Sequence, residues 1–177
     1  MRRSSLTLTL AVLPALLFAA GCNDTSGTSG RIVLADDCDP ASFNAALGAG
    51  TCAHSSTTAG VTLSSFNAEL ASTHKVSAWR MVPTTLNVSV GTTLPVVNAG
   101  GETHTYTEVD EFGGGVVPAL NQASGNTTVA PECADQTKFN SSAVHTGQTM
   151  QHTFDAQGTE KYQCCIHPWM RQTVTVR

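Results

Sequence analysis

The chain from residue 76 onward alternates between apolar and polar residues in short runs. Leu86, Val88 and Val90 occupy every second position and are followed by Gly91, which is typical of a half-buried strand that ends in a turn. Similar short runs predict further strands at residues 94–98, 103–109, 150–154, around 162–164 and around 174–176. Several short strands separated by turns predict a β-sandwich of Greek-key type.

The segment before residue 76 has helical spacing instead. Asp39 is suited to cap a helix that starts at the next residue and ends near Gly48. A second helix is predicted over residues 62–72, where the apolar residues fall near helical spacing. We therefore expect residues 32–75 to form a small helical N-terminal extension and residues 76–177 to form the sandwich domain.

A long stretch inside the sandwich domain lacks either pattern. Residues 111–136 show little periodicity and predict a long loop, and such loops usually carry function or wrap a site. Just before and at its start, Glu108, Asp110 and Glu111 predict a solvated acidic face, and secondarily a docking patch.

The first 21 residues have the composition of a secretory signal. Two arginines precede an uncharged apolar run over residues 6–20, which is too short for a convincing membrane-spanning helix. Cys22 follows Ala-Ala-Gly, which favours lipoprotein processing over an ordinary cleavage site with an incidental cysteine, and residues 22–31 resemble a flexible tether. We expect a protein of the periplasm or cell envelope, in contact with the membrane only through a lipid on Cys22.

Charge and cysteine content narrow the function further. Signal cleavage removes two of the nine basic residues and none of the 13 acidic ones, so the net charge falls from −4 to −6. This acidity argues against nucleic acid as a partner. Setting Cys22 aside leaves five of the six cysteines, and exported cysteines are normally paired or bound to something. Cys38 and Cys52 bracket the first helix, and a disulfide between them would contribute roughly 3 kcal/mol.

Three metal-binding side chains occur close together in KYQCCIHPWMR, residues 161–171: Cys164, His167 and Met170. Soft sulfur suits Cu(I), imidazole suits both oxidation states, and a His₂Cys set with a weak axial methionine is typical of redox-active copper. The second imidazole has to come from elsewhere. His104 is the candidate, because the turn residues 98–101 precede it on a strand end.

Two segments carry a family resemblance: VPTTLNVSVGTTLPVVNAGGETHTYT and TGQTMQHTFDAQGTEKYQCCIHPWMRQTVTV. Together they resemble the cupredoxins, the type 1 blue copper proteins, most closely plastocyanin, pseudoazurin and amicyanin. The resemblance covers roughly residues 80–177 and rests on Y-x-C-x-x-H-P-x-M. It implies a Greek-key cupredoxin β-sandwich, with His104, Cys164 and His167 as equatorial ligands of one copper ion and Met170 as its axial ligand.

The resemblance also implies a function. It predicts an exported electron-transfer protein that is not an enzyme, whose single copper cycles between Cu(I) and Cu(II). Its partners would be redox proteins such as cytochromes or copper oxidoreductases. Thr105 would help tie the ligand loops together, and His167, in an exposed loop, would be the electron exit.

Cys165 stands where those relatives have Ser or Thr. Neighbours in a strand point to opposite faces, so if Cys164 faces the copper, Cys165 faces away from it. A vicinal Cys164–Cys165 bridge would be strained and would destroy the site. Once Cys38 has paired with Cys52, only Cys133 is left for Cys165. We therefore predict a Cys133–Cys165 disulfide that holds the long segment 111–148 beside the copper loop.

Three other interpretations fit the same residues. Cys164 and Cys165 could be ordinary disulfide cysteines. The protein could instead store or deliver copper, although methionine clusters are lacking. It could also have a nitrosocyanin-like catalytic site, although Met170 argues against it. Residues that we expect outside the site, in packing or at the surface, are His54, His74, Trp79, His145, His152 and Trp169.

Overall fold

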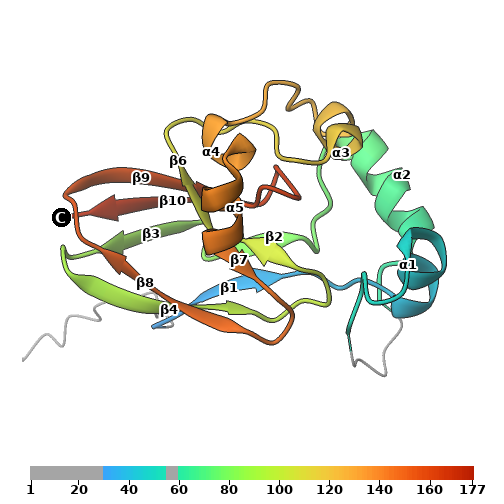
Figure 1. The fold of residues 1–177 in the computed structure, drawn as a ribbon, viewed down its shortest axis with the longest axis horizontal. Coiled ribbons are helices and arrows are strands. Elements are labelled where there is room, and N and C mark those ends of the chain that lie inside the picture. The colour runs from blue at the N-terminus through green and yellow to red at the C-terminus, as the bar shows by residue number, and fades with distance from the viewer. Residues whose placement is uncertain (1–29, 55–59) are drawn as a thin grey trace, which may run out of the picture.

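The computed structural model describes residues 30–54 and 60–177 of the chain. These residues form two four-stranded sheets, one two-stranded sheet and a set of short helices (Figure 1). The predicted signal peptide, Cys22 and most of the predicted tether lie outside the described residues. Among the helices that are described, none is long and apolar enough to cross a membrane.

The first sheet has the strand order β2-β1-β4-β8. Its strands are β1 (Ile32–Ala35), β2 (Arg80–Val82), β4 (Thr92–Asn98) and β8 (Thr149–Phe154). Strand β1 pairs antiparallel with β2 and parallel with β4. The prediction that residues 32–75 are only a helical extension is therefore wrong at its start. A strand of four residues gives too short an alternation to be recognised from the sequence.

The second sheet has the order β3-β10-β9-β6. Its strands are β3 (Thr85–Val88), β6 (Thr107–Val109), β9 (Gly158–Gln163) and β10 (Arg171–Val176). The predicted strand 103–109 is in fact two strands, because β5 (His104–Thr105) pairs with β7 (Ala143–Val144) whereas β6 pairs with β9. The core includes the buried side chains of Ile32, Leu34, Val96, Phe154, Tyr162 and Val174. A mainly β, two-sheet fold is confirmed.

Two helices of the N-terminal segment lie together at one end of the sandwich (Figure 1). Helix α1 (Pro40–Leu47) begins where the Asp39 carboxylate accepts a hydrogen bond from the Ser42 amide, and helix α2 (Leu63–Thr73) is capped by Thr62. Phe66 of α2 packs against Trp79, with ring centroids 4.8 Å apart. This aromatic contact attaches the helices to the sandwich.

The segment that was predicted to be a long loop contains short helices. They are α3 (Pro118–Ala123), α4 (Pro131–Ala134) and, continuing beyond it, α5 (Gln136–Ser142). A proline occupies the first turn of both α3 and α4, where its missing N–H costs nothing. Helices of four to seven residues are too short to give a recognisable helical period, which explains why the pattern looked irregular.

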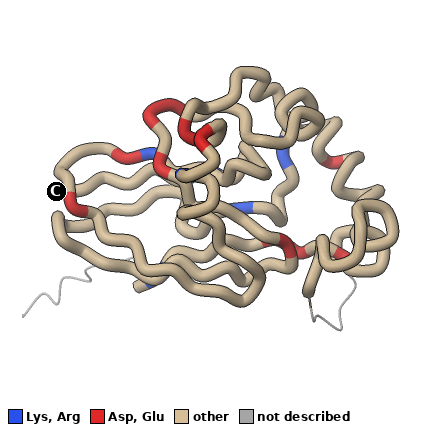
Figure 2. Tube along the Cα trace, viewed as in Figure 1, with Lys and Arg blue, Asp and Glu red and all other residues tan. Residues whose placement is uncertain are grey.

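The cysteine pairing agrees with the prediction. Disulfides join Cys38 to Cys52 and Cys133 to Cys165, and Cys164 is the one free cysteine of the described residues. Figure 2 shows that charged positions are sparse and that several acidic ones lie along β6 and the start of the loop after it. Glu108, Asp110 and Glu111 are exposed there, as expected for a solvated face.

Candidate metal centre

Three predicted ligands come together at one end of the sandwich. The ligand atoms of His104, Cys164 and His167 all lie within 4.8 Å of one another. The Cys164 Sγ is 3.8 Å from Nδ1 of His104 and 3.9 Å from Nδ1 of His167. His104 and Cys164 are fully buried and His167 is 3% exposed. One thiol and two imidazole nitrogens therefore face a common point.

The connection between β9 and β10 supplies two of these side chains. Cys164 follows the last residue of β9, and its amide donates to the Met170 carbonyl over 3.0 Å. The Met170 amide donates in turn to the His167 carbonyl over 2.9 Å. These two bonds close the loop on itself, so the positions of Cys164 and His167 are fixed by the backbone.

His104 comes from a different part of the chain, the first residue of β5. The loop before it is held by Asn98, whose side-chain amide donates to the carbonyls of Glu102 and Val144. The side-chain Oδ1 of Asn98 accepts from the Gly100 amide. Because these bonds tie the loop to itself and to β7, His104 is presented at a fixed point of the sheet edge.

Thr105 connects the two ligand segments. Its amide lies 3.4 Å from the Cys164 Sγ, and its hydroxyl accepts a hydrogen bond of 2.8 Å from the Cys165 amide. The amide and the hydroxyl of Thr105 thus connect β5 to the β9–β10 loop, as the family resemblance implied.

The two histidines favour the thiolate form of Cys164. Burial alone would raise the pKa of this thiol, but hydrogen bonds and charge from His104 and His167 lower it well below its ordinary value. Burial likewise would lower the pKa of His167, whereas its contacts with Cys164 and Glu102 raise it to about 9. The thiolate is the form that binds metals.

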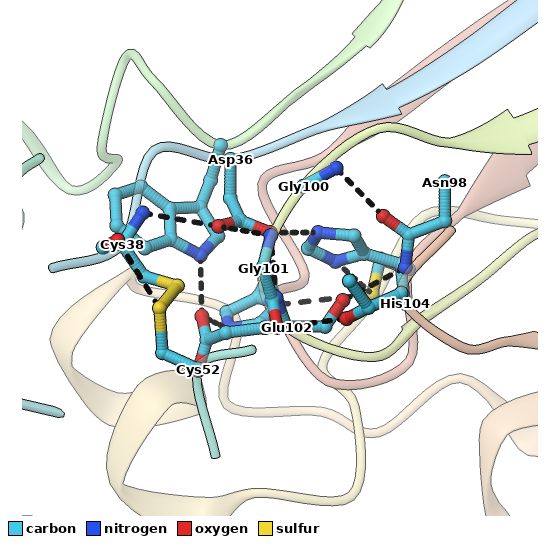
Figure 3. Close-up of polar contacts among 12 residues, drawn as sticks. Asp36, Cys38, Cys52, Asn98, Gly100, Gly101, Glu102 and His104 are labelled. Atoms are coloured by element: carbon cyan, nitrogen blue, oxygen red, sulfur yellow. Dashed lines mark hydrogen bonds and ion pairs between the residues drawn. A yellow bond between two sulfur atoms is a disulfide. The ribbon is translucent and has the colours of Figure 1, made fainter. Parts of the chain in front are cut away.

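Each imidazole also has a carboxylate on its outer nitrogen, which the sequence did not reveal; Figure 3 shows the pair of His104 and Asp36. Nε2 of His104 lies 2.8 Å from Oδ2 of Asp36, and Nε2 of His167 lies 3.3 Å from Oε2 of Glu102. Neither acid shares a spacing motif with its histidine. Asp36 directly follows the short strand β1, so only its tertiary position could identify it.

The exposure predicted for His167 is wrong. Three aromatic rings surround its imidazole, with centroids 6.5 Å away for Phe66, 6.3 Å for Trp79 and 5.5 Å for Trp169. Phe66 belongs to helix α2 of the N-terminal segment, a part of the chain without a counterpart in the resemblance. This helix and the tryptophans cover the edge that the resemblance had implied to be open.

Met170 and the other described histidines are not part of the His-Cys-His cluster. Met170 is fully buried at the end of the ligand loop, and its role as axial ligand stays a prediction. The other described histidines lie outside the cluster. His152, for example, lies within 2.7 Å of the Tyr162 hydroxyl, and His74 contacts the Ala123 carbonyl. Both therefore lie outside the cluster, as expected.

The chemistry of the donor set fits copper. A buried, unpaired thiol is unusual in a chain whose other described cysteines form disulfides. Together with two imidazole nitrogens it makes the trigonal His₂Cys set that copper proteins use for electron transfer. All three donor side chains are buried.

Comparisons with known proteins give partial likenesses. No protein-family model matches the chain, and no curated protein sequence matches it either. Among solved structures, a purple cupredoxin from Nitrosopumilus maritimus is 27% identical, over 58% of this chain and 86% of its own, with a TM-score of 0.39. A reduced amicyanin variant is 22% identical over 58% of this chain and 78% of its own, with a TM-score of 0.37.

A copper-containing nitrite reductase from Thermus scotoductus is 23% identical over 55% of this chain, with a TM-score of 0.35, and the match spans 20% of that protein. Because these similarities are low, the fold is assigned from features of the chain itself. Its Y-x-C-x-x-H-P-x-M motif, its two packed sheets and its buried His-Cys-His cluster together define a cupredoxin-like fold.

Proposed function

We propose that this chain is an exported electron-transfer protein that holds one copper ion between His104, Cys164 and His167. The observation that carries the proposal is the unpaired, fully buried Cys164 Sγ with an imidazole Nδ1 on either side, at 3.8 and 3.9 Å. Bound copper would supply a one-electron couple between Cu(I) and Cu(II). Met170, at the end of the same loop, is the proposed weak axial ligand.

The surrounding residues support such a role by holding the donors still. A rigid donor set lets the ion change oxidation state with little rearrangement. The bonds within the β9–β10 loop fix Cys164 and His167, and Thr105 ties that loop to β5. Because the three donors are buried, the site has no open face for a substrate, so we infer a carrier rather than an enzyme.

The proposed location follows from the sequence, and the proposed partners follow from the family resemblance. The signal-like residues 1–21 and the cysteine that follows them support export and a lipid anchor on Cys22. We infer redox proteins such as cytochromes or copper oxidoreductases as partners. Aromatic side chains cover His167, so electrons would cross this layer rather than leave from an exposed imidazole.

Copper titration of the purified protein tests the proposal. We expect one equivalent of Cu(II) to give an intense visible thiolate-to-copper charge-transfer band, and we expect Cys164→Ser to lack that band. His145→Gln is the matched control, because His145 is exposed and outside the cluster. A band that survives in Cys164→Ser would refute the assignment.

Repeated reduction and oxidation separates electron transfer from copper delivery. A carrier keeps its copper through several cycles with a small-molecule reductant and oxidant, and its band disappears and returns in full. A delivery protein loses copper to a chelator in the reduced state. Loss of metal within the first cycles would therefore favour copper handling.

A further inference from the structure

We propose that Asp36 is a positioning residue for the copper ligand His104, so that the N-terminal segment is part of the metal centre. This inference rests on the proposed function. Asp36 lies outside the region that resembles the cupredoxins, just after β1, and its side chain is completely buried. A buried carboxylate requires partners, and its partners lie around the loop that presents His104.

The Asp36 carboxylate accepts four hydrogen bonds. Oδ1 accepts from the amides of Cys38 and Gly101, at 3.1 and 3.0 Å, and Oδ2 accepts from the Glu102 amide at 3.0 Å and from His104 Nε2 at 2.8 Å. Figure 3 shows the carboxylate between these donors. Three amides fix the acid, so that it in turn fixes the imidazole.

The backbone around Asp36 is shaped for this contact. A side chain on Gly100 would collide with the Asp36 carboxylate, and one on Gly101 would collide with the Cys38 Sγ. The Cys38–Cys52 disulfide begins two residues after Asp36. The glycines therefore permit a close approach between the two loops, and the disulfide holds one of them in place.

The contact with Asp36 determines which ring nitrogen of His104 carries a proton. An ionised carboxylate only accepts hydrogen bonds, so Nε2 of His104 must carry the proton that it donates. In the neutral imidazole this places the single ring proton on Nε2, so that Nδ1, which lies 3.8 Å from the Cys164 Sγ, can bind a metal. A carboxylate on the outer nitrogen also makes the imidazole a stronger donor, which favours Cu(II) over Cu(I).

Glu102 and His167 form a weaker version of this arrangement. Nε2 of His167 is 3.3 Å from the Glu102 Oε2, and the same oxygen also accepts a hydrogen bond of 2.7 Å from the Trp79 indole. Asp36 has the shorter contact to its histidine. We therefore expect the larger effect on copper from Asp36.

The test compares Asp36→Asn with Asp37→Asn and the wild type, all loaded with copper. Asp37 is the next residue and is exposed, so its variant changes the charge equally without touching His104. We expect Asp36→Asn to bind Cu(II) about 10–100-fold more weakly, with a smaller loss for Cu(I). Each tenfold difference between the two would raise the reduction potential by about 59 mV for a one-electron couple.

A second measurement needs no variant and covers the case in which Asp36→Asn does not fold. In the diamagnetic Cu(I) form, NMR should show the His104 Nε2 proton shifted downfield, as a hydrogen bond to the Asp36 carboxylate would shift it, and protected from exchange with water. A bare Nε2, or a proton that exchanges freely, would overturn the proposal.

These experiments distinguish a failure of the Asp36 inference from a failure of the proposed function. Equal potentials and affinities in the Asp36→Asn and Asp37→Asn variants, with a normal band in the wild type, would overturn this inference alone. If the wild type gives no thiolate-copper band at all, the proposed function is wrong and the inference fails with it.

Discussion

Removal of the Phe66 ring tests whether helix α2 stabilises the sandwich and covers the metal centre. Phe66 is 4% exposed and has aromatic neighbours on several sides: its centroid lies 5.7 Å from Phe43, 4.8 Å from Trp79 and 5.9 Å from Trp169. A Phe→Ala change in a core costs about 3–5 kcal/mol. Aromatic pairs contribute about 0.5–1.5 kcal/mol beyond the burial of their apolar surface. We therefore expect Phe66→Ala to lower the free energy of unfolding by an amount near the upper end of the range of about 3–5 kcal/mol.

The same change should open a route to His167, whose ring is 6.5 Å from that of Phe66. Urea denaturation of the copper-free, disulfide-intact protein measures the free energy of unfolding. Stopped-flow reduction of the copper form by a small-molecule reductant measures access to the site, and we expect a faster reaction in Phe66→Ala. Leu47→Ala is the control, since Leu47 is 56% exposed in the same extension, and it should change stability by less than about 0.5 kcal/mol. A loss below about 2 kcal/mol together with an unchanged rate would refute this view of α2.

Three further predictions concern separate parts of the chain. The double variant Cys133→Ser/Cys165→Ser should lose about 3.7 kcal/mol of unfolding free energy, because the disulfide spans 32 residues; an unchanged denaturation midpoint would contradict this. Burial lowers the pKa of His152 below its ordinary 6.5, so the folded protein binds fewer protons than the unfolded chain and stability falls as the pH drops below about 6.5; His152→Gln should weaken that fall, and equal pH profiles would count against it. Wild-type protein should partition with membranes through Cys22, and Cys22→Ala should be soluble or poorly processed; wild type recovered only as a free species would rule out the anchor.

The ligand loop could be predicted because its chemistry is local. Cys164, His167 and Met170 stand three residues apart, and few other roles combine a thiol, an imidazole and a thioether in one loop. The strands with clear alternation, such as β3 and β8, were predicted because that pattern is also local. The disulfides followed from parity and elimination, because five of the six cysteines remain when Cys22 is set aside, and an odd number leaves one unpaired.

The features that the sequence concealed are those set by tertiary contacts. Asp36 reaches His104 across 68 positions of the chain, and no spacing rule connects them. Strand β1 alternates over four residues only, and α4 and α5 are too short for a helical period. The cover over His167 comes from α2, whose apolar residues predicted a packed helix but not the surface on which it packs.

A crystal structure of the copper-loaded protein, with anomalous scattering recorded at the copper absorption edge, tests the central claim most directly. We expect a single anomalous peak within bonding distance of the Cys164 Sγ and of Nδ1 of both His104 and His167, with the Asp36 carboxylate still on Nε2 of His104. A peak elsewhere in the molecule, or a Cys164 that is bonded to another cysteine, would contradict it.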